Sequence, residues 1–236
     1  MRLIASSLML AVSAAAAPAT PANSAAAGLS LPTQIVITLT LLTVLPAVIM
    51  AVTPFLRIVV VLHFLRQALG TQSTPSNQIL IGLALFLSLM LIQPLCMDVY
   101  DNAWKPFETG KLSGEAAWHR ASQPVKAYLS KFAREKDVKL MLEASHDAAP
   151  RSPEELELRV LVPAYILSEL KAAFQIGAVI YLPFLVIDLL VASVTLSLGM
   201  VQLPPVMISA PFKLILFVLV DGWNLVVGSL LKSLQV

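Results

Sequence analysis

The sequence predicts an all-α integral membrane protein of kinked helical hairpins, with about four hydrophobic regions and a small, mainly helical polar domain. Of its 236 residues, 58% are hydrophobic and only 13% are charged, and the mean hydropathy is +0.82. Soluble domains carry roughly 25% charged residues. Residues 98–159 hold ten Lys and Arg and eleven Asp and Glu, which leaves only six and three elsewhere. One polar domain therefore interrupts an otherwise apolar chain.

The N-terminal residues 1–27 have the pattern of a secretory signal peptide followed by a linker. Arg2 precedes a short apolar core from Leu3 to about Val12, and an alanine-rich run comes next. This core is too short to cross a bilayer, which takes about 20 apolar residues. The pattern allows cleavage at several places between Ala14 and Ala27, and the alternative is an uncleaved anchor.

Residues 33–97 are predicted to form a first helical hairpin region and a second apolar helix. The run Thr33–Gly70 is long enough for two short helices or one broken helix. Pro46 and Pro54 would supply the breaks, because proline removes a helix hydrogen bond and clashes with the preceding turn. The run Ile79–Met97 carries no charge and is about one bilayer thickness long.

The polar domain, residues 98–159, is predicted to be mainly helical because apolar residues recur at helical spacing between Val125 and Phe132. Residues 160–200 are too long for one uninterrupted crossing, so Pro183 is expected to divide them into a kinked helical hairpin. Residues 201–236 would then supply a loop and a C-terminal apolar helix.

The distribution of positive charge predicts a topology. The segment 57–78 carries Arg57 and Arg66 and no acidic residue, so the positive-inside rule places it in the cytoplasm. A cleaved signal followed by alternating crossings then places residues 98–159 and the C-terminus in the periplasm. The chain is therefore expected to be a multi-pass protein of the bacterial inner membrane.

Motifs for catalysis and for metal binding are missing. The histidines are His63, His119 and His146, and none stands in an H-E-x-x-H arrangement. The sequence has no G-x-S-x-G, no phosphate-binding G-x-x-x-x-G-K and no cysteine–histidine metal spacing. A net charge of +2 without a basic stripe argues against nucleic-acid binding. We therefore predict neither an enzyme nor a cofactor, and expect Cys96 to be a small buried hydrophobe.

Five ionisable residues inside the apolar regions are the candidate functional residues: Glu169, Lys171, Asp188, Lys213 and Asp221. Such groups are costly in apolar segments and usually face a bundle interior, a water-filled path or a partner. Glu169 and Lys171 are two residues apart, so they do not share a helix face and each needs a partner elsewhere. These residues leave two alternatives open, the ion or proton path of a polytopic transporter and charges neutralised across a subunit interface.

Three blocks of the sequence closely resemble the FliP family of flagellar type III export-gate proteins. They are "MAVTPFLRIVVVLHFLRQALGTQSTPSNQILIGLALFLSLMLI", "PAYILSELKAAFQIGAVIYLPFLVIDLLVASVTLSLGM" and "LPPVMISAPFKLILFVLVDGWNLVVGSL". The resemblance covers roughly Met50 to Leu231 and is loose over residues 98–159. It implies a structural pore subunit at the flagellar basal body, through which unfolded flagellar proteins cross the inner membrane. It also implies a homopentamer, with FliQ, FliR, FlhB and FlhA as partners.

The resemblance further implies a gate. Family members carry a methionine-rich loop after the third apolar region, where three methionines often stand together. The matching residues here are Met200, Val201 and Gln202. Thioether side chains are flexible and polarizable and can seal around varied chains. A single methionine therefore predicts a leakier closed state, or a seal that is shifted to other residues or to partner subunits.

The resemblance gives the charged residues a role in assembly. We expect Glu169 and Lys171 to pair with groups on neighbouring subunits or helices, and the expected counterparts are Lys213 and Asp221. Together with Asp188 they would form an intersubunit charge network that fixes the stagger of the protomers. Prolines are expected to set the kinks of the hairpins: Pro46, Pro54, Pro163, Pro183, Pro204, Pro205 and Pro211.

Overall fold

Among the residues that the structure describes, all regular structure is helical and no strand occurs. The computed structural model describes residues 30–71, 73–145, 155–200 and 204–234. The chain divides at Pro46 into two units, 1–46 and 47–236, and each is considered by itself. The predicted signal peptide, residues 1–27, lies outside the described residues. The all-α prediction is confirmed.

The first two helices confirm the break that was expected at Pro54, but the break expected at Pro46 is wrong. Helix α2 (Leu31–Val52) is apolar and contains Pro46 without ending there. Pro54 stands at the N-cap of α3 (Phe55–Ala68), so it separates the two helices. Gly70 follows with a φ of +74° and donates its N–H to the last turn of α3. Glycine tolerates this left-handed conformation and ends the helix.

The second apolar helix is longer than the sequence predicts. Helix α4 (Asn77–Val99) continues through a π-helical turn, η1 (Tyr100–Trp104), into α5 (Lys105–Glu108). The boundary expected at Asp98 therefore falls inside a helix, because polar residues replace apolar ones there without a helix-breaking signal. Cys96 is exposed on this helix, so the prediction that it is buried is wrong.

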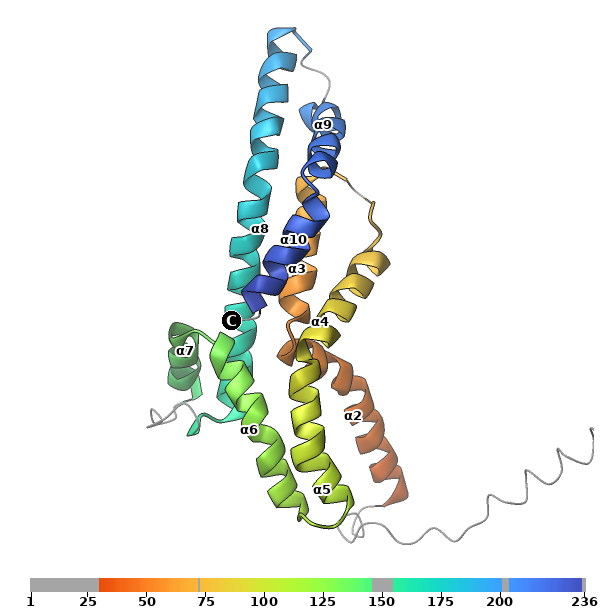
Figure 1. Cartoon of the computed structure of the whole chain (residues 1–236), viewed down its shortest axis with the longest axis vertical. Helices are drawn as coiled ribbons and strands as arrows, with labels where there is room; N and C mark the ends of the chain where they lie inside the picture. Colours follow the sequence, from red (N-terminus) through yellow and green to blue (C-terminus); the bar gives the residue numbers. More distant parts are fainter. Residues whose placement is uncertain (1–29, 72, 146–154, 201–203, 235–236) are drawn as a thin grey trace, which may run out of the picture. The chain divides into compact units, whose positions relative to one another are not determined.

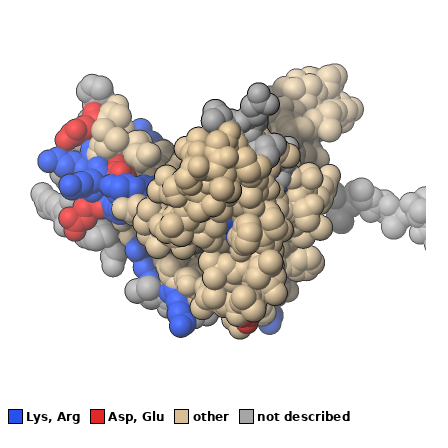
Figure 2. All heavy atoms as spheres, turned by 90° about the horizontal axis from the view of Figure 1, so that it is seen from above, with Lys and Arg blue, Asp and Glu red and all other residues tan. Residues whose placement is uncertain are grey.

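Two amphipathic helices, α6 (Gly114–Phe132) and α7 (Glu135–Ser145), form most of the described part of the polar domain. Leu129 is fully buried against α8, with Val125 packed beside it. This confirms the predicted helical face. In Figure 2 the charged atoms gather on the side of the molecule where Figure 1 places α6 and α7, and the rest of the visible face is largely uncharged.

The third apolar region is one helix of 40 residues, α8 (Leu158–Ser197), so the prediction of a hairpin within residues 160–200 is wrong. Pro163 and Pro183 lie inside α8. A proline removes one helix hydrogen bond, which a helix held by neighbouring helices can tolerate with a bend. The chain reverses only after α8, and the hairpin consists of α8 and α9 (Pro205–Leu219), which lie side by side in Figure 1.

The C-terminal region is bent. Pro204 is the N-cap of α9, Pro205 opens the helix and Pro211 lies within it. Proline suits a helix start because the first N–H groups have no partner within the helix. Helix α10 (Gly222–Leu234) follows Asp221, whose φ is 51°, and the axes of α9 and α10 differ by 66°. The C-terminal apolar helix expected within residues 201–236 is therefore a pair of helices with a bend between them.

Three helical segments in the described residues are long and apolar enough to cross a membrane, and the bent pair of α9 and α10 would make a fourth. The three are Leu31–Val52, Asn77–Glu108 and Leu158–Ser197. This agrees with the predicted number of hydrophobic regions.

Two apolar clusters stabilise the unit formed by residues 47–236. In the first, α3 packs between α8 and α4, with α9 and α10 contributing further side chains. In the second, α6 and α7 pack on the N-terminal half of α8 around Leu129, Leu161 and Tyr165. Burying one such large apolar side chain contributes roughly 1.5–3 kcal/mol. Helix α8 belongs to both clusters and connects the polar domain to the apolar helices.

A glycine allows α3 and α8 to approach closely. A methyl group on Gly177 of α8 would lie 2.6 Å from the ring of Phe64, which itself makes an edge-to-face contact with Phe174 at 5.3 Å between ring centroids. We expect Gly177→Ala to lower the free energy of unfolding by about 1–3 kcal/mol, because the ring cannot move without disturbing its neighbour. Thermal unfolding in detergent checks this prediction. Gly82→Ala is the matched control, since nothing lies within 4 Å of that position. Equal melting temperatures for the two variants would contradict the close packing.

Candidate functional site

A buried ion pair connects α3 to α8. The carboxylate of Glu169 is fully buried and accepts two hydrogen bonds from the guanidinium of Arg57, Nε to Oε2 at 2.7 Å and Nη2 to Oε1 at 2.5 Å. This two-point geometry is the strong form of a charge-assisted hydrogen bond. Arg57 Nη1 also donates to the backbone carbonyl of Ser233 at 3.0 Å. The pair therefore holds α3, α8 and the end of α10 together.

The burial of Arg57 corrects one sequence prediction. Arg57 was assigned with Arg66 to a cytoplasmic basic flank, but only 6% of Arg57 is exposed. Arg66 is partly exposed and donates to the side chain of Asn77 at 2.6 Å. Arg57 does not face solvent or lipid headgroups, so the positive-inside argument for this segment rests on Arg66 alone.

A second ion pair connects α9 to α8. Lys213 is 1% exposed, and its Nζ donates to Asp188 Oδ2 at 2.6 Å and to the carbonyl of Ala68 at 3.0 Å. Ser209 donates its hydroxyl to the other oxygen of Asp188. Because Ala68 is the last residue of α3, the ammonium group also lies at the negative end of that helix dipole.

The structure assigns different partners from those that the sequence suggested. The predicted pairing of Glu169 with Lys213 is wrong within this chain, because each has another partner. Lys171 and Asp221 are exposed, so their role between subunits stays a prediction. The partner that sequence reasoning missed is Arg57. Its place inside an apolar helix was a signal, since an arginine there needs a counter-charge.

A third polar cluster, beside Glu169, was not predicted. Ser168 accepts a hydrogen bond from the backbone N–H of Arg134 at 2.9 Å and donates to Asp137 Oδ2 at 2.5 Å. Arg134 also forms an ion pair with Asp137. The cluster holds the first turn of α7 against α8. On α8, Ser168 therefore contacts the polar domain, and the next residue, Glu169, contacts the apolar helix α3.

Apart from the contact of Arg57 with Ser233, these polar contacts lie within a segment that known proteins share. The model of the FliP family matches residues 38–230. The chain belongs to the FliP family. A relative from Bacillus subtilis (strain 168) is 48% identical over 200 residues, which cover 85% of this chain and 90% of that protein. A relative from Pectobacterium carotovorum is 48% identical over 204 residues, 86% of this chain and 79% of the relative. Both relatives are named flagellar biosynthetic protein FliP.

The residues that match the family gate are only partly described. In this FliP-family chain Met200 is exposed just after the end of α8, and its N–H donates to the carbonyl of Thr195 at 3.0 Å. Val201 and Gln202 lie outside the described residues. Among residues that are described, no group of three or more His, Cys, Asp or Glu could hold a metal ion.

The contact between α7 and α8 should depend on pH. Desolvation opposes ionisation of Asp137, but hydrogen bonds from Ser168 and Arg134 outweigh it, so the pKa of Asp137 lies below its usual value of 3.8. The stabilisation is therefore complete above that value and is lost as the pH falls through the lower pKa of the folded state. Lys171 acts in the same direction.

We expect Asp137→Asn to lower the free energy of unfolding near neutral pH and to flatten its decrease between about pH 5 and pH 2. Chemical unfolding followed by circular dichroism across that range provides the measurement. Glu135→Gln is the control, because Glu135 is exposed in the same first turn of α7. The assignment to Asp137 would be withdrawn if its acid-dependent loss survived in Asp137→Asn.

Proposed function

We propose that this FliP-family chain is a pore-forming structural subunit of the flagellar type III export gate. Unfolded flagellar proteins would cross the inner membrane through the assembly that it builds. Membership of the family and the names of the relatives support a role in flagellar biosynthesis. The observation that carries the structural role is the state of the buried charges, since Glu169 and Asp188 are each held by a cation of the same chain.

This arrangement disfavours the alternative of an ion or proton path. A carboxylate that carries protons has to exchange them with water, whereas Glu169 is fully buried and both its oxygens bind Arg57. Asp188 is engaged by Lys213 and Ser209. The two ion pairs fix the positions of α3, α8, α9 and α10 relative to one another. A fixed arrangement of helices suits a structural subunit that packs against other subunits.

The outer faces of the α8–α9 hairpin support assembly with other chains. They expose large apolar side chains, among them Leu190, Phe212 and Val218. Apolar surface of this extent is covered by lipid or by other proteins. The proposed covering consists of further copies in a homopentamer, of FliQ and FliR, and of surrounding lipid, with FlhB and FlhA as further partners. The proposal places the polar domain on the periplasmic side of the inner membrane, at the flagellar basal body.

The loop after α8 is the proposed constriction, and disulfide crosslinking tests this. Met200→Cys is introduced in a Cys96→Ser background, because Cys96 is exposed and would otherwise react. Under the proposal, copies of Met200→Cys in the assembled complex crosslink to one another and to a stalled export substrate. Val218→Cys is the control, an exposed position on α9 that should not reach the substrate. Crosslinks from residue 200 to lipid or to outer helices alone would remove the loop from the pore.

A further inference from the structure

The last turn of α6 lies against the buried ion pair of Arg57 and Glu169. The centroid of the Phe132 ring, at the end of α6, is 5.6 Å from Cζ of the Arg57 guanidinium. Phe132 also packs against both apolar clusters, so it stands where the polar domain meets the apolar helices. An aromatic face attracts a guanidinium most strongly where water is excluded. The polar domain therefore supplies part of the surroundings of the ion pair.

Two tyrosines continue this contact one turn back along α6. The ring of Tyr128 lies 5.2 Å from that of Phe132 and 6.1 Å from that of Tyr165 on α8, measured between centroids. Tyr165 is fully buried and stands one turn before Glu169. Burial and the nearby carboxylate of Glu169 both raise the pKa of Tyr128. The aromatic side chains of α6 thus cover the ion pair on the side of the polar domain.

Hydrogen bonding is incomplete where the polar domain meets α8. In the described part of the chain, two buried side-chain atoms lack a hydrogen bond of normal geometry, the hydroxyl oxygen of Tyr165 and Nε of Arg134. Both belong to this contact, because Tyr165 lies against Tyr128 and the backbone N–H of Arg134 donates to Ser168. A buried polar group without a partner costs free energy, and water can supply the partner. Opening of this contact therefore regains hydrogen bonds, which offsets part of its cost.

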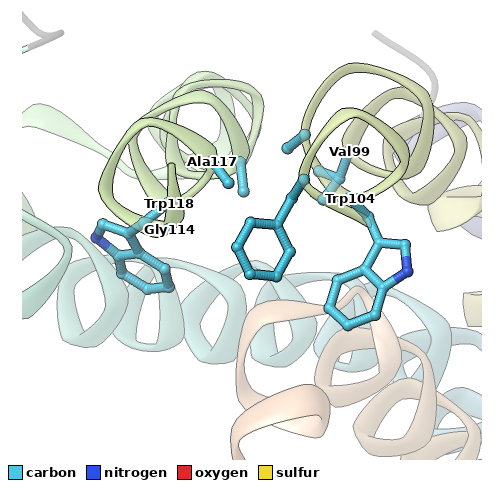
Figure 3. Close-up of a pocket in the computed structure, with 8 residues that line it drawn as sticks. Val99, Trp104, Gly114, Ala117 and Trp118 are labelled. Carbon is cyan, nitrogen blue, oxygen red and sulfur yellow. The ribbon is translucent and has the colours of Figure 1, made fainter. Parts of the chain in front are cut away.

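The other end of α6 is loosely packed. A hollow of about 220 Å³ lies between the start of α6 and the preceding helices η1 and α5, and Trp104 and Trp118 border it (Figure 3). Such a gap forfeits the dispersion contacts that hold closely packed helices together. Gly110, in the turn before α6, has a φ of +72°, and glycine permits the backbone rotation that a hinge needs. Helix α6 can therefore tilt about this end with little loss of packing.

We propose that the last turn of α6 is a hinged cover that keeps water away from the Arg57–Glu169 pair while the polar domain is docked on α8. Its covering side chains are Tyr128 and Phe132. The hydrogen bonds of Ser168, the neighbour of Glu169, hold the cover closed. In the closed state the low local dielectric strengthens the ion pair. When α6 and α7 lift from α8, water reaches the pair and loosens the link between α3, α8 and α10. The polar domain thereby controls the rigidity of the apolar helices, whether or not the chain forms a pore.

The coupling between Phe132 and the ion pair tests the cover. Phe132→Leu is made in the unaltered chain and in a chain that carries Arg57→Met and Glu169→Leu, where both partners are apolar. Because the ring acts on a charge, we expect Phe132→Leu to raise the unfolding equilibrium constant about fivefold more when the pair is charged. Chemical unfolding of the full chain in detergent, followed by circular dichroism, gives both values.

A second aromatic residue provides the control for this cycle. Phe174 of α8 contacts Phe64 of α3, so Phe174→Leu should cost the same stability with the charged and the apolar pair. Equal losses for Phe132→Leu in the two chains would overturn the cover, because the ring would then contribute packing alone.

Hydrogen–deuterium exchange read by mass spectrometry tests the opening without altering the cover. Ser168→Ala removes the hydrogen bonds that join α8 to Arg134 and Asp137. We expect amide exchange to become about fivefold faster in α6 and α7, and also in the first turns of α3 and in α10, which these hydrogen bonds do not involve. Ser193→Ala is the control, since the hydroxyl of Ser193 donates to a carbonyl of its own helix α8.

The pattern of exchange decides the outcome. Faster exchange that is confined to α6 and α7 would overturn the proposal, because the polar domain would then lift without releasing the ion pair. Unchanged exchange in all four helices would overturn it as well, because the contact would not open. This reading stays decisive if Phe132→Leu fails to fold. Failure of the pore proposal would alter neither measurement, since both use the chain without other gate subunits.

Discussion

Glu169→Leu is expected to lower the free energy of unfolding by about 3–5 kcal/mol, because it leaves the guanidinium of Arg57 buried without its counter-charge. Arg57 would keep its hydrogen bonds to Ser233 and its contact with the ring of Phe132, but no counter-charge. An arginine cannot escape the cost by losing a proton. Thermal unfolding of the purified protein in detergent measures the effect. If the assembly role holds, the variant also fails to enter the export complex.

A double variant separates the ion pair from a general loss of packing. Arg57→Met combined with Glu169→Leu replaces both charges by apolar groups of similar size, which is often neutral or stabilising for a buried pair. We expect it to recover most of the stability that Glu169→Leu loses. Lys171→Met is the matched control, an exposed charge two residues away on the same helix. A double variant no more stable than Glu169→Leu would show that the two residues do not act as a pair.

Asp188→Leu should have the second largest effect, a loss of about 2–4 kcal/mol in the free energy of unfolding. Lys213 would lose its counter-charge while 1% exposed and would keep the carbonyl of Ala68. The loss is smaller than for Glu169 because an unpaired lysine can become neutral by releasing its proton, which arginine cannot do. Thermal unfolding in the same detergent gives the comparison.

A double variant tests whether Asp188 and Lys213 are partners, because it should recover the stability that Asp188→Leu loses. Lys213→Met combined with Asp188→Leu is expected to restore stability, and Lys232→Met on α10 serves as an exposed control. The crossed exchange Glu169→Lys with Lys213→Glu should not recover, since those residues do not meet in the chain. Recovery by the crossed exchange alone would reverse the assignment of partners and restore the pairing that the sequence suggested.

Composition and local signals predicted the helical class and several helix ends. Pro54 separates α2 from α3, and Gly70 follows the end of α3 in the conformation that glycine favours. The continuity of α8 could not be predicted in the same way. Pro163 and Pro183 weaken a helix locally, but whether the helix ends depends on the neighbours that support it, and these come from distant segments. A helix can also continue from apolar into polar sequence, which is why α4 passes Asp98.

The sequence indicated which charged residues of the candidate site matter, but it did not indicate which residues they pair with. The spacing of Glu169 and Lys171 correctly indicated different faces, since the first is buried and the second is exposed. Glu169 and Lys213 were correctly singled out as charges in apolar helices. Their partners depend on how α3, α8 and α9 cross, which hydrophobic periodicity does not specify. Arg57 was assigned to membrane topology because it also fits the positive-inside pattern.

The bond between Arg57 and Glu169 joins residues 112 positions apart in the chain. Loss of either charge alone is expected to leave the other buried without its counter-charge, so neither position should change freely while the other stays. Evolution has to replace both within a short interval or keep both. Positions 57 and 169 are therefore expected to change together among related proteins, although they lie far apart in the chain.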